Sequence, residues 1–281
     1  MRKECAVEPE RGVTIVRARK AFLSLGLREL WSYRELLFFF TWRDVKVRYK
    51  QAVLGVLWGL IDPFLKMVVF SIVFGRVAGL SSEGYPYPVF VFAGLLPWQF
   101  FSDAVNRSGQ SVVAGAGILK KVYFPRLVLP VSAIGASLVD LSFSFLILAG
   151  IMLFYGVKPG IGILAVVPLT ALTALTALSV GIFISALNAI YRDFRYILPF
   201  IIQLWFFLTP VIYSTSIFPE RFRWLLALNP VTGIIDGYRH AILQRPMPGG
   251  SLLVSVGISV FMLAIGLVVF RRMERYFADI V

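Results

Sequence analysis

Hydrophobic residues gather in six long stretches that short polar segments separate. The stretches cover residues 52–75, 88–104, 127–155, 161–190, 196–213 and 252–270. The hydrocarbon core of a bilayer is about 30 Å thick, and about 20 apolar helical residues cross it. Backbone amides find no water there, so each stretch must close its own hydrogen bonds as a helix. The pattern therefore predicts an all-α integral membrane protein with six transmembrane helices.

The segment before the first stretch has a different pattern. Residues 1–26 are charged without a clear period and predict a cytoplasmic arm, whereas residues 27–50 predict an amphipathic helix with a basic entry to the first span. One face of this helix holds Leu27, Leu30, Trp31, Leu37 and Phe38. Such a helix suits the membrane interface, but it also suits packing on the protein itself. Residues 43–50 alternate as a strand would, yet their place before an apolar stretch favours a basic run at the headgroup level.

One sizeable outer segment, residues 214–250, precedes the last stretch. It holds two short amphipathic patterns, at residues 220–228 and 231–243, separated by Asn229-Pro230. Asn at the N-cap with Pro at the first helical position is a favourable helix start. Helices this short cannot span, so we expect them to dip into the outer leaflet as re-entrant helices or to cap a pore. The rest is a single transmembrane domain: residues 51–270 hold the six spans, and residues 271–281 form a cytoplasmic tail.

The formal net charge of +13 would suit a nucleic-acid-binding protein, but its distribution indicates a membrane orientation instead. With the N-terminus inside, four inner segments hold 20 of the 28 Lys and Arg residues, and the outer segments hold six. The inner segments are residues 1–51, 120–126, 192–195 and 271–281. Cytoplasmic loops are enriched in Lys and Arg, so both termini are predicted to be cytoplasmic.

Motifs for catalysis are few. The chain has no G-x-x-x-x-G-K-[ST] phosphate loop and no G-x-S-x-G serine. Its one histidine, His240, cannot build a zinc site alone. The outer acids are Glu83, Glu220 and Asp236, and a catalytic carboxylate pair would need an unforeseen meeting among them. We therefore expect no catalytic residue, metal or cofactor in this chain, and transport would need an energy source elsewhere.

Charged residues inside the apolar stretches are candidates for function, because charge is costly at that depth. Asp62 and Lys66 lie four residues apart and can pair on one helix face. Asp103 and Arg107 form a second such pair. Asp140 stands near the middle of the third stretch without a partner in its own helix, and we expect it to face the bundle. A purely structural pairing is the alternative reading of these charges.

Four segments carry a family pattern. They are residues 41–58 (TWRDVKVRYKQAVLGVLW), 92–98 (FAGLLPW), 120–126 (KKVYFPR), and 188–194 (NAIYRDF) continuing to Thr209-Pro210-Val211. In this order they resemble the permeases of ABC-2-type polysaccharide exporters, the membrane subunits that export lipid-linked O antigen, capsule or teichoic acid. The resemblance covers roughly residues 28–275, and it does not separate these polymers from each other.

The resemblance implies a homodimer of six-helix subunits, paired with two copies of a separate P-loop ATPase that binds ATP and Mg. The ATPase would contact the helix before the first span and the loop between spans two and three. In this chain the contacts fall on Arg28, Glu35, Tyr123, Phe124, Pro125 and Arg126. The cargo would be an undecaprenyl-linked polysaccharide, with O antigen as first choice. It would thread a channel across the bacterial cytoplasmic (inner) membrane.

Two groups of residues become candidates for the cargo path. Arg43, Lys46, Arg48 and Lys50 could meet the lipid pyrophosphate. The rings of Trp98, Trp205 and Phe206 could stack on sugars in the polysaccharide channel. Three alternatives stay open: a permease for capsular polysaccharide or teichoic acid, a membrane-embedded enzyme acting on lipid-linked sugars, and an ion-coupled transporter. In the last case Asp62, Lys66 and Asp140 would carry protons.

Overall fold

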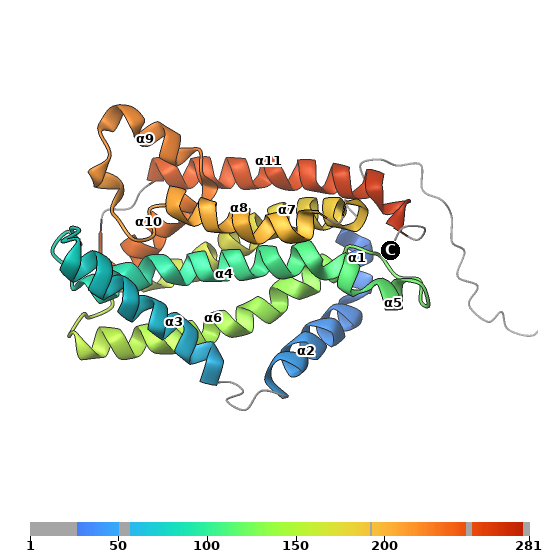
Figure 1. Ribbon diagram of the computed structural model, residues 1–281, viewed down its shortest axis with the longest axis horizontal. Coiled ribbons are helices and arrows are strands. Elements are labelled where there is room, and N and C mark those ends of the chain that lie inside the picture. The colour runs from blue at the N-terminus through green and yellow to red at the C-terminus, as the bar shows by residue number, and fades with distance from the viewer. Residues whose placement is uncertain (1–26, 51–56, 192, 246–248, 278–281) are drawn as a thin grey trace, which may run out of the picture.

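The computed structural model describes residues 27–50, 57–191, 193–245 and 249–277, and this part of the chain is helical without strands (Figure 1). The longer helices are α2 (Arg34–Lys50), α3 (Leu57–Phe70), α4 (Tyr87–Ala114), α6 (Val128–Phe154), α7 (Val166–Ile190), α8 (Phe194–Leu208), α10 (Pro230–Leu243) and α11 (Gly249–Glu274). The shorter ones are α1 (Leu27–Ser32), the π-helical η1 (Ser71–Val77), α5 (Ala116–Leu119), the 3-10 turns η2 (Ile161–Ala165) and η3 (Thr215–Ile217), and α9 (Glu220–Ala227). The all-α fold class is confirmed.

Within the described chain, five helices are long and apolar enough to cross a membrane. They are Leu57–Val77, Tyr87–Ala114, Val128–Phe154, Ile161–Ile190 and Gly249–Glu274. The remaining predicted stretch holds α8, whose 15 residues extend about 22 Å. Pro210 follows shortly after its end and has no N–H with which to continue a helix. The predicted stretch 196–213 is therefore a shorter apolar helix than the sequence pattern indicates.

Helix α4 is the centre of the bundle. It packs against α6, α7 and α10, and its residues from Val89 to Phe101 are buried except for the half-buried Gln99. The fit against α7 is close: a Cβ on Gly109 would lie 2.8 Å from the side chain of Ile184. Because such a contact leaves no room for a methyl group, glycine allows the two backbones to approach. Helix α11 lies alongside α7 and completes the bundle (Figure 1).

We name the two ends of the bundle by the orientation that the positive charges predict. The inner end holds α1 and α5, and the outer end holds η1, α9 and α10 (Figure 1). Helices α4, α6, α7 and α11 run between these ends, so each side chain along them has a definite level in the bundle.

The outer segment forms two helices at the predicted positions. Asn229 caps α10, since its side-chain oxygen accepts the Val231 N–H at 3.1 Å and Pro230 follows at the first helical position. Helix α10 packs on α4, α7 and α11, and 12 of its 14 residues are buried, so it is part of the bundle at the outer end. In α9, by contrast, no residue is buried.

Helix α2 runs beside α6 over part of its length (Figure 1). The Thr41 hydroxyl in the middle of α2 donates to the Ser132 carbonyl at 3.1 Å, and the Tyr49 hydroxyl near the C-terminal end of α2 donates to Asp140. Asp140 lies 12 residues beyond the start of α6, which is about 18 Å along it. Residues 43–50 are therefore helical rather than a strand. Through Tyr49, the end of α2 contacts α6 at the level of Asp140.

Candidate functional site

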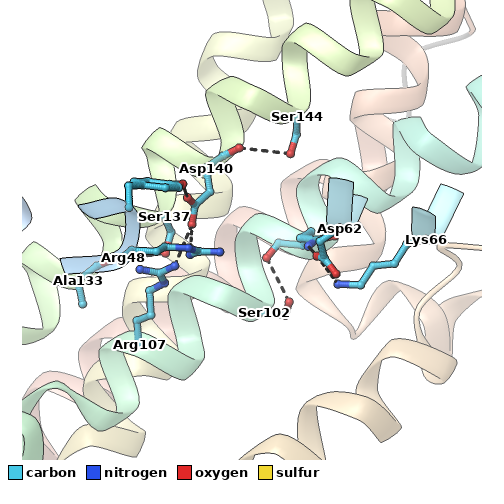
Figure 2. A network of polar contacts seen from close by, with 11 residues as sticks. Arg48, Asp62, Lys66, Ser102, Arg107, Ala133, Ser137, Asp140 and Ser144 are labelled. Atoms are coloured by element: carbon cyan, nitrogen blue, oxygen red, sulfur yellow. Dashed lines mark hydrogen bonds and ion pairs between the residues drawn. The ribbon is translucent and has the colours of Figure 1, made fainter. Parts of the chain in front are cut away.

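Three helices bring charged side chains together at Asp140 of α6. Its carboxylate accepts hydrogen bonds from Arg107 of α4 at 2.9 Å, and from Arg48 and Tyr49 of α2. Figure 2 shows both arginines directed at this carboxylate. Asp140 therefore faces the bundle and is shared by two guanidinium groups, and Asp103 lines the same cavity.

The helical ion pair expected between Asp103 and Arg107 is wrong. Arg107 pairs with Asp140 instead, and Asp103 makes no ion pair with any residue in the described ranges. The long arginine stem reaches across the α4–α6 contact, so the acid on the facing helix competes with the acid one turn away. Spacing along one helix could not show this competition.

Asp62 and Lys66 of α3 do form the ion pair that their spacing predicts. Lys66 Nζ lies 2.8 Å from Asp62 Oδ2, and Gln99 of α4 donates to the same oxygen at 2.6 Å. This pair lies apart from the two arginines on Asp140 (Figure 2). Asp62, Gln99 and Asp140 all line one cavity of about 280 Å³. No group of three His, Cys, Asp or Glu side chains suited to a metal ion occurs in the described part of the chain.

A second cavity, of about 370 Å³, adjoins the first, and four of its eleven lining residues are aromatic. The ring centroids of Trp98 and Phe206 lie 5.5 Å apart, and Phe70 stacks on Phe206 at 5.6 Å. Gln99 lines both cavities, and Lys66, the partner of Asp62, lines the second. Helices α3, α4 and α8 therefore form one wall that changes from charged to aromatic towards the outer end. We call it the α3–α4–α8 wall.

Trp205, the third predicted aromatic, lies beside this wall rather than on the cavity lining. Its ring meets Phe101 edge-on at 5.1 Å, and its indole N–H donates to Asn229 Oδ1 at 3.0 Å. The Asn229 amide in turn donates to Thr209 Oγ1 at 2.8 Å. Because Asn229 also caps α10, one side chain joins the aromatic wall to the outer helix.

The four basic residues near the end of α2 have different partners. Arg43 pairs with the adjacent Asp44 at 2.8 Å, and Arg48 is bonded to Asp140. Lys46 and Lys50 are exposed, and neither ammonium group has an acid partner within the described residues. Lys46 lies 5.4 Å from the ring centroid of Trp42.

At the inner end, the loop 120–126 is fastened to its surroundings by two side chains. Phe124 is buried with its ring centroid 5.6 Å from that of Phe40 on α2. The guanidinium of Arg126 lies 5.8 Å from the ring centroid of Phe277. These two contacts therefore link the loop to α2 and to the segment just after α11.

The other inner residues singled out by sequence differ in exposure. Tyr123 is 74% exposed and Glu35 is also exposed, whereas Pro125 is half-buried. Arg28 lies in α1, and its side chain is outside the described part. Tyr123 and Glu35 are thus open to a partner, while Phe124 is not.

Sequence reasoning missed Arg239 of α10, which is completely buried. It donates to the Val211 carbonyl at 2.8 Å and to the Tyr213 carbonyl at 3.2 Å. Its guanidinium lies 3.9 Å from the Phe90 ring centroid and 3.9 Å from the Asp236 carboxylate. The i,i+3 spacing from Asp236 on an otherwise apolar helix was the available signal. Arg239 fixes the chain after α8 to α10.

Glu83 ties the loop before α4 to the outer segment. Its carboxylate accepts hydrogen bonds from Ser214 and Ser216 and pairs with Arg245. Burial acts to raise the pKa of Glu83, but these hydrogen bonds and the charge of Arg245 outweigh it. The pKa of Glu83 therefore lies below its ordinary value. Glu83 is charged at neutral pH and holds two outer segments together.

Comparison with known proteins covers nearly the whole chain. The family described as ABC-2 type transporter matches residues 35–243. The chain is 32% identical over 256 residues to the O-antigen export system permease protein RfbA of Myxococcus xanthus, covering 90% of this chain and 98% of that protein. It is 29% identical over 247 residues to RfbA of Klebsiella pneumoniae, covering 88% and 95%. The polysialic acid transport protein KpsM of Escherichia coli is 23% identical over 246 residues, covering 83% and 91%.

Proposed function

Because the chain belongs to the ABC-2 type transporter family, we propose that it is the permease subunit of an ATP-driven exporter of lipid-linked polysaccharide, with O antigen as first-choice cargo. The observation that carries this proposal is the α3–α4–α8 wall. A charged cavity at Asp62 and Asp140 continues through Gln99 into an aromatic cavity at Trp98 and Phe206. Relatives named as O-antigen permeases match this chain over nearly their full length, which supports the choice of polymer.

The wall suits a sugar polymer for chemical reasons. Glycan hydroxyls exchange hydrogen bonds readily with carboxylate, ammonium and amide groups. The apolar C–H faces of sugar rings stack on Trp and Phe without a strong directional bond, so a chain can slide past. In this proposal Trp98 and Phe206 contact the glycan, and Trp205 holds their neighbourhood in place.

We propose that a second copy completes the channel. Helices α3 and α8 expose large apolar side chains beside the two cavities, among them Phe64, Phe200 and Phe207. Apolar faces of this kind need lipid or protein contact. In a homodimer with α3 and α8 at the centre, the two walls would enclose one path through the bacterial cytoplasmic membrane, with both termini on the cytoplasmic side.

The motor is proposed to be a separate P-loop ATPase, two copies of which bind ATP and Mg below the inner end. Glu35 and Tyr123 are exposed there and Arg28 lies in the adjoining α1. The buried Phe124 and the Arg126–Phe277 contact would transmit movement of the loop 120–126 to α2 and α11. Since α2 ends on Asp140, that movement would reach the charged cavity.

The lipid pyrophosphate would enter at the basic run, and the structure sharpens its test. Neutralising Arg48 would remove positive charge but would also break its bond to Asp140. The double variant Lys46→Gln with Lys50→Gln removes positive charge without breaking an ion pair of the described residues. We expect export to fall severely while the ATPase remains bound. The matched control is Arg272→Gln with Arg275→Gln, which removes the same charge from exposed side chains at the inner end, near the end of α11. Equal export by both double variants would remove the pyrophosphate role.

The function itself is tested by purifying the tagged protein from its native membrane and identifying the proteins and glycolipids that accompany it. We expect a P-loop ATPase and an undecaprenyl-linked glycan. Reconstituted alone, the permease should neither move nor modify the glycolipid, and adding the ATPase with ATP should start transport. Modification of the glycolipid by the lone protein would favour the enzyme alternative. Transport by the lone protein along a proton gradient would favour the ion-coupled alternative.

The role of the aromatic side chains on the α3–α4–α8 wall is tested separately. We expect Trp98→Ala with Phe206→Ala to slow export strongly without loss of ATPase binding. The control is Phe222→Ala on α9, which removes an exposed ring outside both cavities. If the wall variant exports at the wild-type rate, the glycan does not pass along it.

A further inference from the structure

A third cavity, of about 350 Å³, lies at the outer end, away from the α3–α4–α8 wall. Its walls come from α9, α10 and α11, and include Arg223, Trp224, Thr232, Asp236, Gly250 and Ser251. Ligand cavities in proteins hold about 300–1,000 Å³. This one is therefore at the small end of that range, suited to a single ring rather than to a long chain.

Two polar groups of α10 on this cavity are incompletely satisfied. Thr232 is 2% exposed, and its hydroxyl has no hydrogen-bond partner among the described residues. Asp236 follows four residues later on the same helix face. Its carboxylate lies 3.9 Å from Arg239 but accepts no hydrogen bond from the described residues. Buried hydroxyls in native proteins nearly always have a partner, so the pair indicates a ligand that supplies hydroxyl groups.

Helix α9 adds an aromatic plate and a guanidinium. Trp224 lines the cavity and is 60% exposed, so its ring is accessible. Arg223 gives its Nε–H to the Phe218 carbonyl at 3.1 Å and lies 3.6 Å from Glu220, which leaves other N–H groups for a ligand. Because Glu220 offsets this positive charge and Asp236 adds a negative one, the cavity disfavours an anion.

We propose that this cavity binds one neutral pyranose unit. The C–H face of the ring stacks on Trp224, adjacent hydroxyls donate to the Asp236 carboxylate, and Thr232 and Arg223 bond the remaining oxygens. The choice of a sugar rests on the proposed function, since a polysaccharide leaving the outer end would present such units there. The site would retain the emerging glycan outside the channel.

The test uses the purified full-length protein in lipid nanodiscs and saturation-transfer difference NMR. The probes are methyl α-D-mannopyranoside, methyl β-D-galactopyranoside and methyl β-D-glucopyranoside, with glycerol phosphate as the anionic comparison. We expect saturation of ring C–H protons in at least one pyranoside. Asp236→Asn should weaken binding about tenfold through loss of charge-assisted hydrogen bonds. Thr232→Val should weaken it about threefold through loss of one neutral bond.

Controls separate recognition from folding. Trp224→Leu changes an exposed side chain, so it should abolish the ring signal while the protein elutes as wild type. Trp31→Leu and Asp193→Asn remove an exposed Trp and an exposed acid that do not line this cavity. Both variants should bind the pyranosides as wild type does. The inference is overturned if no pyranoside binds, if glycerol phosphate binds instead, or if Trp224→Leu and Asp236→Asn bind unchanged. Export by the reconstituted wild-type complex is measured separately. If export occurs but no pyranoside binds, the proposed function stands and only the sugar site is overturned.

Discussion

Asp140 and Arg239 are both charged residues inside one helical bundle, but their surroundings satisfy them differently. Asp140 has charged partners from two other helices, and its side chain is 13% exposed beside a cavity. Arg239 has a 1% exposed side chain, and its hydrogen bonds go to two backbone carbonyls. Charges around a cavity can rearrange with water or a ligand, whereas a charge bonded to buried backbone cannot move without unfolding its neighbours.

The difference assigns separate roles to the two regions. The Asp140 cluster joins α2, α4 and α6 at the level where the proposed path is charged. The Arg239 region joins α10 to the chain after α8, where the path is aromatic. A transporter needs a region that can change and a frame against which it moves. We interpret the outer region around Arg239 as part of that frame.

Arg239→Ala should have the largest effect on stability. It leaves the carbonyls of Val211 and Tyr213 without donors and empties the space against Phe90. Each buried unsatisfied group costs about 1–3 kcal/mol, so we expect a total loss of about 4 kcal/mol. SDS-induced unfolding of the purified protein measures the loss. The control Arg221→Ala removes an exposed arginine of α9 and should change stability by less than about 0.5 kcal/mol. Similar values for the two variants would mean that Arg239 is not a structural anchor.

Asp140→Asn should cost less, about 2–3 kcal/mol, because the two arginines it leaves unpaired are partly open to the cavity. Combining it with Arg107→Gln should recover part of this loss, since one unpaired charge is then removed. The same SDS unfolding assay applied to the two single variants and the double variant gives the coupling energy. Additive losses would contradict the ion pair between Asp140 and Arg107. Asp193→Asn, an exposed acid, is the matched control.

The two regions also differ in how far the sequence could predict them. Asp140 is conspicuous as a lone acid in an apolar stretch, and Asp62 with Lys66 follows from helical spacing. The partners of Asp140 could not be foreseen, because Arg48 is 92 residues away and its contact depends on how α2 packs against α6. Periodicity reports which face of a helix is apolar, but not which helix covers that face.

Arg239 also shows that local sequence signals do not predict which helices pack together. The pattern of α10, its Asn229 cap and its boundaries could all be predicted, since capping and spacing are local. Whether the helix is exposed or buried is decided by its packing on α4 and α7, which are distant in sequence. A basic residue on a short outer helix therefore reads as exposed, although the structure buries it completely. The family resemblance supplied the fold and function class, but it did not supply this burial.

Trp205→Phe extends the comparison to a neutral side chain of the outer region. The variant keeps a ring against Phe101 but loses the hydrogen bond to Asn229, so we expect a loss of about 1 kcal/mol. Trp98→Phe is the control, because the Trp98 indole makes no hydrogen bond within the described residues. Its loss should be clearly smaller in the same SDS unfolding assay. Equal losses would mean that Trp205 stabilises the fold through the size of its ring and not through its hydrogen bond to Asn229.

Glu83→Gln should give the smallest effect, and one that depends on pH. Because the pKa of Glu83 in the folded protein lies below its ordinary value, the charged form stabilises the fold. This contribution is complete above the ordinary pKa of about 4.3, and is lost as pH falls through the lower folded pKa. Since Glu83 is partly exposed, we expect on the order of 0.5 kcal/mol at neutral pH.

Measuring SDS unfolding between neutral pH and acid checks the Glu83 prediction. The wild type should lose stability relative to Glu83→Gln as the pH falls, until the two curves meet. Glu220→Gln, which changes an acid with a 90% exposed side chain, should follow the wild type throughout. A constant difference between wild type and Glu83→Gln across the range would show that the carboxylate charge contributes nothing. The two outer segments would then be held by contacts other than the Glu83 charge, among them the Arg239 hydrogen bonds to the Val211 and Tyr213 carbonyls and the Asn229 cap of α10.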